Sequence, residues 1–346
     1  MAEVLRLWFG DHPDNFLADG RFLKRQDYTL DSVANYYDDE EPEIPYKHNR
    51  LFLDNGAFAA ARHGINLDPE RVKAIQEDFD PDYTIPLDYP MLPGMYERTM
   101  ERRWKKTQEN TIDVQDTANL REVVPALHAW SRSSLRMNLR WVLKHADSDY
   151  VAVGSIVSKS FRATRTYFGD RMPNRELVDM LVETNYYIHE HSDFSVHMMG
   201  FGSSPLMLHL GFYCGIDSTD TTGYRRGAAY GKIILPGTGW RAVSDRDRTF
   251  GDTRLTPDEK IELSRCRCPV CRENQRLLAS DWKARAVHNR HVLLREEAKA
   301  RKMIEEGFEV YEGYVSRVFA GSRAQWMRNL WEYAKVKVHT QYKFYL

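Results

Sequence analysis

Three cysteines occupy a span of six residues, in the pattern C-x-C-x2-C at Cys266, Cys268 and Cys271. Two histidines follow in the chain, His288 and His291. Thiolates and imidazoles are the ligands that tetrahedral zinc takes in proteins. The chain has four cysteines in all, so this crowding indicates a metal site rather than unrelated thiols or a redox pair. The pattern predicts structural Zn²⁺ held by four protein ligands, with no position left open for a substrate.

The fourth zinc ligand requires the chain to fold back after the last cysteine. One continuous helix as far as His288 would carry that histidine about 25 Å away, because a helix rises about 1.5 Å per residue. Residues 279–281 offer a break, with Ser280 or Asp281 as the N-cap of a second helix. His288 would then return to the cysteines on that helix. His291, one turn further along the same face, is the alternative ligand.

Four aspartates form a second set of residues suited to chemistry. Each follows or ends a short segment that predicts a strand: Asp54, Asp88, Asp217 and Asp220. A single aspartate in such a place is more often a turn former or a helix cap. Four of them around one rim, with glycine-bearing turns between, favour an active site. Two carboxylates on one rim could divide the work at a reacting carbon, since one attacks or stabilises the carbon and the other moves protons.

The segments that must position these residues alternate between strand and helix patterns. Short segments predict eight strands, at residues 5–9, 51–53, 83–87, 123–127, 150–153, 195–199, 215–220 and 232–235. Helical patterns predict helices at residues 69–79, 96–110, 131–146, 175–189 and 205–213. This alternation predicts an α/β fold, a (β/α)8 TIM barrel, with a doubly wound sheet as the alternative. We expect residues 1–255 to form the barrel and residues 256–346 a zinc-binding subdomain with C-terminal helices.

Composition limits the class of protein. The 346 residues carry a formal net charge of −1, so the chain lacks the overall basic charge of many nucleic-acid binders. Charge is uneven, however, with an acidic stretch at residues 38–43 and a basic helix face made by Arg98, Arg102, Arg103, Lys105 and Lys106. Each of these runs is expected first as a solvated surface. We find no apolar stretch that predicts a membrane span and no signal peptide, and so expect a reduced, cytoplasmic location.

These motifs together resemble the queuine/archaeosine tRNA-guanine transglycosylase superfamily, and most closely its DNA-modifying branch, over residues 51–291. Its members exchange guanine for a 7-deazaguanine through a covalent enzyme–nucleic acid intermediate. Residues 54–58 are similar to the Asp-Ser-Gly-Gly-Phe motif, whose aspartate is an acid/base, which implies that role for Asp54. Residues 215–220 are similar to the Gly-Val-Asp-x-Phe-Asp run, which implies Asp220 as the nucleophile. The cysteines with the trailing His288-Asn289 look like the family's zinc site.

The resemblance also implies residues that bind the base. Asp88 falls where the family reads the guanine edge, Gly154 where the backbone approaches the base, and His128 where the family usually has glutamine. Ser155 and Ala57 stand where glycine is usual. Four aromatic side chains at the rim are candidates for stacking on the base, although each is more often a core residue: Phe58, Tyr89, Trp130 and Tyr224.

Departures from the tRNA-acting members favour DNA as the polymer. After the nucleophile those enzymes continue with Cys and a Leu-Pro-Thr-Arg segment, whereas residues 221–226 read TTGYRR here. We also expect a short helical tail after the zinc site rather than an RNA-binding module. Arg225 and Arg226 would pair with phosphates beside the nucleophile. The expected activity is insertion of a preQ0-type base into DNA through a covalent aspartyl-DNA intermediate.

Several alternatives stay open. A tRNA-guanine transglycosylase and a non-catalytic nucleic-acid-binding subunit would share the same fold, although the latter would be expected to lack one of the two acidic residues. A metal-dependent hydrolase would need histidines at the ends of several strands. Among the predicted strand ends, His128 is the one histidine. The expected partners are DNA or tRNA and the free 7-deazaguanine base. The sequence does not decide whether a helper protein or a homodimer is involved.

Overall fold

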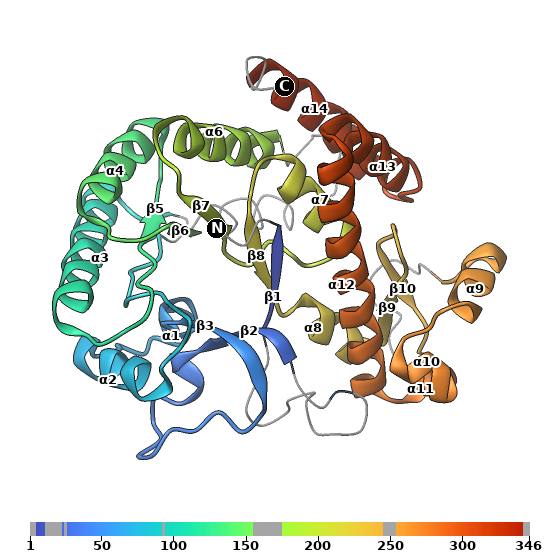
Figure 1. Cartoon of the computed structure of the whole chain (residues 1–346), viewed down its shortest axis with the longest axis horizontal. Helices are drawn as coiled ribbons and strands as arrows, with labels where there is room; N and C mark the ends of the chain where they lie inside the picture. The colour runs from blue at the N-terminus through green and yellow to red at the C-terminus, as the bar shows by residue number, and fades with distance from the viewer. Residues whose placement is uncertain are drawn as a thin grey trace.

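The computed structural model describes residues 5–10, 23, 26–91, 94–154, 175–244 and 254–341. Within these ranges, eight parallel strands form one sheet with helices arranged around it (Figure 1). The strands are β1 (Arg6–Gly10), β2 (Gln26–Ser32), β3 (His48–Asp54), β4 (Tyr83–Thr84), β5 (Ala126–His128), β6 (Tyr150–Gly154), β7 (Ser195–Met198) and β8 (Ser218–Thr221).

The eight strands close into a barrel. Their order is β4-β3-β2-β1-β8-β7-β6-β5, and every pairing is parallel. The two ends of this series meet where Thr84 of β4 forms a parallel bridge with Val123, just ahead of β5. The amide of Thr84 donates to the carbonyl of Glu122 at 2.9 Å, and the amide of Val124 donates to the carbonyl of Thr84 at 2.8 Å. The predicted (β/α)8 barrel is confirmed.

Two of the barrel helices begin at serine N-caps. Ser131 caps α4 by accepting a hydrogen bond from the amide of Ser134, and Ser204 caps α7 ahead of Pro205 at the first turn. The helices are α1 (Ala57–His63), α2 (Pro69–Phe79), α3 (Glu97–Thr117), α4 (Arg132–His145), α6 (Arg175–His191), α7 (Pro205–Tyr213) and α8 (Gly223–Ala229), with a 3-10 turn η2 (Val33–Asn35).

One predicted barrel strand is wrong, and one barrel strand is not predicted by the sequence pattern. Residues 232–235 do not belong to the barrel: they contain β9 (Lys232–Ile234), which pairs antiparallel with β10 (Trp240–Ala242) in a separate sheet. The missing barrel strand is β2, whose sequence QDYTLDS is mostly polar. Asp31 of β2 is nevertheless buried, because the hydroxyls of Tyr36 and Tyr46 donate hydrogen bonds to its carboxylate.

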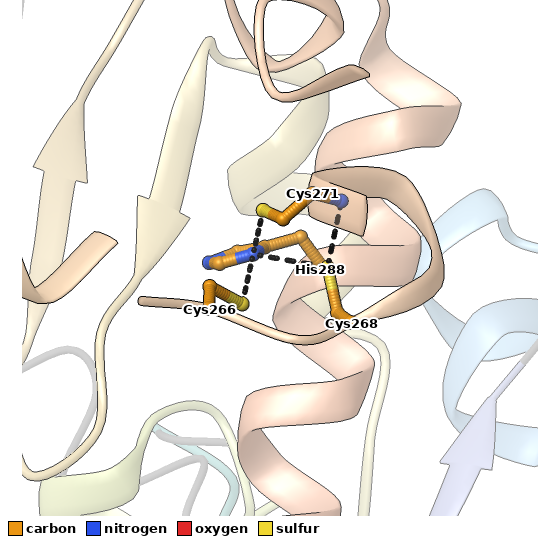
Figure 2. A group of neighbouring side chains, drawn as sticks. All are labelled: Cys266, Cys268, Cys271 and His288. Carbon is orange, nitrogen blue, oxygen red and sulfur yellow. Dashed lines mark hydrogen bonds between the residues drawn. The ribbon is translucent and has the colours of Figure 1, made fainter. Parts of the chain in front are cut away.

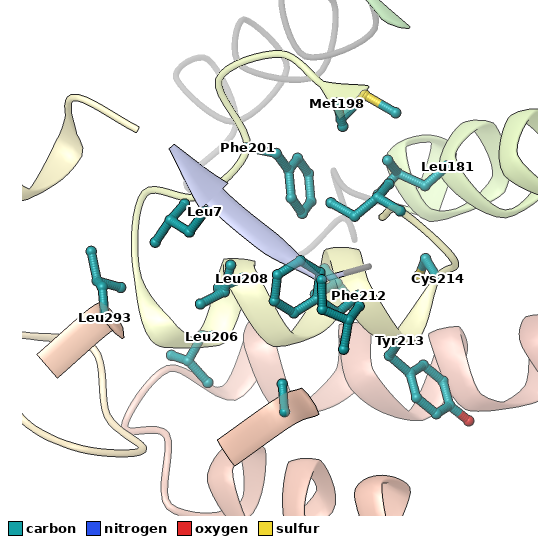
Figure 3. Close-up of a cluster of buried hydrophobic side chains, with 14 of the residues drawn as sticks. Leu7, Leu181, Met198, Phe201, Leu206, Leu208, Phe212, Tyr213, Cys214 and Leu293 are labelled. Carbon is teal, nitrogen blue, oxygen red and sulfur yellow. The ribbon is translucent and has the colours of Figure 1, made fainter. Parts of the chain in front are cut away.

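The C-terminal helices pack on the barrel through a shared apolar core. They are α9 (Pro257–Ser264), α10 (Pro269–Asn274), α11 (Leu277–Ser280), α12 (Trp282–Glu306), α13 (Phe308–Ala320) and α14 (Gln325–Gln341). Figure 3 shows Leu7 of β1, Leu208 of α7 and Leu293 of α12 gathered in one buried cluster. In Figure 1, α12 runs between the barrel and the group formed by β9, β10 and α9–α11. A domain division at residue 255 stays a prediction.

None of the helices in the described ranges combines the length and the apolar character that crossing a membrane requires.

Candidate active site and zinc centre

Three aspartates meet at the carboxyl-terminal end of the barrel strands, which we call the mouth. Asp54 is the last residue of β3, Asp220 lies in β8, and Asp88 follows β4 by four residues. The carboxylates of Asp88 and Asp220 both raise the pKa of Asp54, which is an effect of like charges that lie close together. Three of the four carboxylates that the sequence predicts around one rim therefore lie close together in the structure.

Asp54 has an acidity suited to proton transfer. Burial raises its pKa to about 7, and the negative charges of Asp88 and Asp220 add to the effect. A hydrogen bond of 3.0 Å from the amide of Gly56 acts in the opposite direction. Gly56 has a φ of +81°, and a Cβ there would meet Ala34, so glycine is required to bring this amide to the carboxylate. At neutral pH both protonation states of Asp54 are populated.

The protein holds the Asp220 carboxylate through one of its two oxygens, Oδ1. The amide of Gly200 donates to its Oδ1 at 2.5 Å, and Nε2 of His197 lies 3.5 Å from the same atom. No hydrogen bond from the described residues reaches Oδ2. His197 is fully buried in β7 and is fixed by Oγ of Ser218, 2.9 Å from its Nδ1. Sequence patterns assign His197 no role of its own, although one histidine inside the apolar strand SVHM is a visible signal.

Asp217 lies at the opposite end of the barrel from the mouth. It directly precedes β8, and its carboxylate accepts a hydrogen bond of 2.8 Å from the amide of Val196. Nε2 of His189 is 3.2 Å from the same oxygen. Asp217 therefore links the starts of β7 and β8. The prediction of four carboxylates around one rim is wrong for Asp217, because its carboxylate is used to join these two strands.

Asp88 and His128 form a buried pair. Their Oδ2 and Nε2 atoms are 2.6 Å apart, and the His128 carbonyl accepts a hydrogen bond from Asn138. Oδ1 of Asp88 receives no hydrogen bond from the parts of the chain that the structure describes, so it is available to a ligand. Gly154 ends β6 beside this pair, where a Cβ would stand 2.9 Å from Cε1 of His128. Ser155, predicted as its neighbour in the site, lies outside the described residues.

The four rim aromatics have different environments. Phe58 on α1 is 47% exposed, and Tyr89 and Trp130 are partly buried. Tyr224, in contrast, is fully buried, and its hydroxyl donates to the carbonyl of Gly10 at 2.9 Å. The prediction that Tyr224 can stack on a base is wrong, because its ring belongs to the core between α8 and β1.

Arg225 and Arg226 lie on α8, which begins directly after β8. Arg226 is exposed, whereas Arg225 is partly buried with its guanidinium 5.9 Å from the ring centre of Trp282. In the sequence, both arginines closely follow the candidate nucleophile Asp220. Arg226 is the more accessible of the two to a phosphate.

The predicted zinc ligands form one cluster (Figure 2). Nδ1 of His288 lies 3.6 Å from the sulfurs of Cys266 and Cys268 and 3.5 Å from that of Cys271. In a tetrahedral site with Zn–S of about 2.3 Å and Zn–N of about 2.0–2.1 Å, the sulfur–nitrogen edge is about 3.6 Å. The residues present therefore fit zinc in both chemistry and spacing.

The chain returns to the cysteines as expected. Asp281 caps α12 by accepting hydrogen bonds from the amides of Lys283 and Ala284, so the chain turns between α11 and α12. His288 on α12 is buried and its Nε2 lies 2.9 Å from the carbonyl of Ile234, a second contact that fixes the ring with Nδ1 toward the sulfurs. His291 is not part of the cluster.

The mouth itself does not resemble a metal site. Among the described residues, one group of three or more His, Cys, Asp or Glu side chains has its ligand atoms within 4.8 Å of one another, and it consists of the three cysteines and His288. Asp54, Asp88 and Asp220 do not form such a group, which gives no support to the metal-dependent hydrolase.

Comparison with known proteins identifies the family. A family model described as queuine tRNA-ribosyltransferase matches residues 47–320. The chain belongs to this family. A tRNA-guanine(15) transglycosylase of Methanococcus aeolicus is 23% identical over 271 residues, which cover 74% of this chain and 37% of that protein. The chain thus corresponds to little more than a third of the relative's length. The queuine tRNA-ribosyltransferase match extends from β3 to the end of α13 and so includes both the mouth and the zinc cluster.

Proposed function

We propose that this protein is a guanine transglycosylase that exchanges guanine in a nucleic acid for a 7-deazaguanine base. One observation carries the proposal: Asp220, with one oxygen anchored and the other available, shares the mouth with Asp54, whose pKa is about 7. A nucleophilic carboxylate beside a proton donor and acceptor is what base exchange at C1′ requires.

The first half of the reaction removes guanine. Oδ2 of Asp220 forms a bond to C1′ as the bond from C1′ to N9 breaks, and Asp54 in its protonated form gives its proton to the departing guanine. The polymer is then held as an ester of Asp220, and Asp54 is left ionised. The negative charge of Asp220 also stabilises the oxocarbenium-like state at C1′.

The second half inserts the new base. The incoming 7-deazaguanine loses its N9 proton to the ionised Asp54, N9 attacks C1′, and the ester bond to Asp220 breaks. Asp54 ends protonated and Asp220 ends as a free carboxylate, so the enzyme returns to its starting state. A pKa near 7 allows the same group to serve as acid first and base afterwards.

Asp88 and His128 are proposed to select the base. The Oδ1 atom of Asp88 is an acceptor for the N1–H and the amino group of guanine, and His128 keeps that carboxylate in place through its other oxygen. Gly154 leaves room beside His128. Phe58 and Tyr89 offer ring faces near the base, which must first leave the stack of its neighbours at a cost of a few kcal/mol.

The Cys266, Cys268, Cys271 and His288 cluster is proposed to hold structural Zn²⁺. With four protein ligands the ion supplies folding energy rather than a reactive water. The cluster fastens α10 to α12, and Asn289, next to His288, accepts a hydrogen bond from Ile234 and donates to the carbonyl of Tyr224. This arrangement ties the zinc-bearing segment to α8, which follows the nucleophile.

We infer that DNA is the polymer. The support is the segment after Asp220, where TTGYRR replaces the pattern typical of tRNA-acting members and places Arg225 and Arg226 on α8. The alternative is tRNA, and the names of the family model and of the Methanococcus aeolicus relative favour it. A non-catalytic subunit is the weaker alternative, because both Asp54 and Asp220 are present and converge.

One experiment separates these alternatives. The purified protein is incubated with radiolabelled preQ0 and an equimolar mixture of plasmid DNA and total tRNA, which are then separated and counted. Label in DNA that disappears with Asp220→Ala supports the proposal. Label in tRNA alone would replace DNA with tRNA as the substrate, and label in neither polymer would contradict transglycosylase activity with this base.

A further inference from the structure

A cavity of about 410 Å³ lies beside the mouth, between α1 and α3. Its wall includes Asp88 and Tyr89, while Asp54, Asp220 and His128 are not part of it. The cavity is therefore not the proposed base site. It lies next to that site, and Asp88 belongs to the wall of both. Its volume is within the range of about 300–1,000 Å³ that small-molecule sites usually have.

The floor of this cavity is apolar. Three alanines of α1, Ala57, Ala60 and Ala61, face it together with Leu67 and Leu87. Larger side chains at the alanine positions would occupy the space, so the cavity exists because this turn of α1 is built from small residues. A floor of this kind suits the flat face of a heterocycle or the carbon atoms of a sugar.

The rim of the cavity is basic. Arg102, Arg103 and Lys106 line it from one side of α3. Arg103 donates to the carbonyl of Pro90 at 2.5 Å and so holds the chain after Asp88 against α3. Within the described residues, neither Arg102 nor Lys106 forms an ion pair with a carboxylate, whereas Lys105 on the outer side of α3 lies 3.8 Å from Glu109.

Tyr89 connects the rim to the floor. It lines the cavity, and Nζ of Lys106 lies 5.2 Å from the centre of its ring. Aromatic rings beside cations are typical of sites that hold single nucleotides, because the ring stacks on a base while the cation meets a phosphate. The basic face of α3 thus borders the cavity, and the ring of Tyr89 lies beside one of its cations, Lys106.

From these observations we infer that the cavity is a subsite for the nucleotide adjacent to the exchanged guanosine. The base or sugar of that nucleotide rests on the alanine floor beside Tyr89, and its phosphate binds Arg102 and Lys106. This inference rests on the proposed function, since it assigns the neighbouring site to the flipped nucleotide. The shared Asp88 wall places the two nucleotides next to each other along one strand.

The test is a double-mutant cycle between the cavity and the substrate. The variants are Ala61→Phe, which fills the cavity from its edge, and Arg102→Ala with Lys106→Ala, which removes the rim cations. Lys105→Ala is the matched control on the outer side of α3. The substrates are short oligonucleotides of the polymer that takes up label, with an abasic residue placed on the 5′ or the 3′ side of the target guanine.

We expect an abasic residue on one side to raise the KM of the wild-type protein and of Lys105→Ala roughly tenfold, in line with the contribution of one stacked base. For Ala61→Phe the same abasic residue should change KM by less than about twofold, because the subsite is already filled. The double cation variant should raise KM for the intact oligonucleotide and leave KM for the free base unchanged.

Three outcomes would overturn the inference. Equal sensitivity of wild type and Ala61→Phe to the abasic residue would show that the cavity does not hold the neighbour. A raised KM for the free base with unchanged flank dependence would assign the cavity to the incoming base instead. Absence of exchange by the wild-type protein on DNA and on tRNA would remove the proposed function itself, a result distinct from the first two. Ala60→Leu, a smaller filling of the same floor, serves if Ala61→Phe does not fold.

Discussion

Gly200 donates its amide hydrogen to Oδ1 of Asp220 and leaves Oδ2 of that carboxylate without a hydrogen bond from the described residues. The turn after β7 thus anchors the candidate nucleophile from the neighbouring strand, and the buried ring of His197 lies behind it. A carboxylate fixed in this way loses little side-chain freedom when it attacks, which is how a rigid barrel contributes to a displacement at carbon.

Replacement of the nucleophile should abolish the covalent intermediate. We expect wild-type protein, incubated with its polymer at low guanine concentration, to form an adduct that survives denaturing gel electrophoresis. Asp220→Ala should form none, while Asp217→Ala should still form it, because Asp217 is bonded to the amide of Val196 at the far end of the barrel. The reverse pattern would transfer the nucleophilic role to Asp217.

The pKa of Asp54 predicts how adduct formation depends on pH. Burial and the charges of Asp88 and Asp220 raise this pKa to about 7, and the first half of the reaction needs the protonated form. The protonated fraction falls as pH rises through 7, so adduct formation should be about tenfold slower at pH 8 than at pH 6. Single-turnover rates of adduct formation measure this. In Asp54→Asn the rate should be very low and should lack this inflection.

The same carboxyl predicts a pH-dependent gain in stability on substitution. Because the pKa of Asp54 is raised in the folded state, ionisation of the unfolded chain favours unfolding increasingly from pH 3.8 to about 7 and constantly above that. The neutral amide in Asp54→Asn would remove this cost. The free energy of unfolding of Asp54→Asn relative to wild type should therefore increase by about 2–3 kcal/mol between pH 5 and pH 8. Urea unfolding at the two pH values measures it, and a constant difference would contradict the raised pKa.

The zinc site predicts the metal content of point variants. Freshly purified protein should contain one zinc per chain, and Cys268→Ser or His288→Ala should contain far less and should unfold at lower temperature, because metal binding contributes folding free energy. His291→Ala is the matched control, since His291 lies outside the cluster, and should keep its zinc. Elemental analysis of the three variants decides this. Loss of zinc in His291→Ala with retention in His288→Ala would show that His291, and not His288, is the fourth zinc ligand.

Arg225 and Arg226 predict the salt dependence of binding. Removal of one phosphate-binding cation should reduce the slope of log K against log salt by about 0.7–0.9. We expect Arg226→Ala, which removes an exposed guanidinium, to lower the slope by about one such step, and the double variant by more. Lys144→Ala is the control, because it lies at the end of α4 away from the mouth. An unchanged slope in the double variant would show that these arginines do not bind phosphates.

Local patterns made the zinc cluster and most of the barrel predictable from sequence. The cysteines are close in the chain, and the cap at Asp281 marks the point where the chain returns, so the ligands could be inferred without knowledge of the tertiary contacts. The candidate carboxylates were found because aspartates that end parallel strands gather at one end of a barrel.

The errors arose where tertiary contacts override local pattern. β2 carries the buried polar residues Thr29 and Asp31, which no apolar periodicity marks, and hydroxyls outside the strand make the burial of Asp31 tolerable. Residues 232–235 are as apolar as a barrel strand but pair with β10 instead. Likewise nothing in the sequence near Tyr224 shows that its hydroxyl meets the end of β1.

The closure of the barrel at Thr84 has a consequence for its motions. β4 consists of two residues, and two backbone hydrogen bonds join it to the chain ahead of β5. Such a short ladder costs less to open than the long pairing of β2 with β3. We therefore expect the barrel to open locally at this contact first. Amide hydrogens at Thr84 and Val124 should exchange with solvent before those in the middle of β3. Asp88 lies four residues beyond Thr84, so we expect any opening of this ladder to displace the Asp88 side of the mouth.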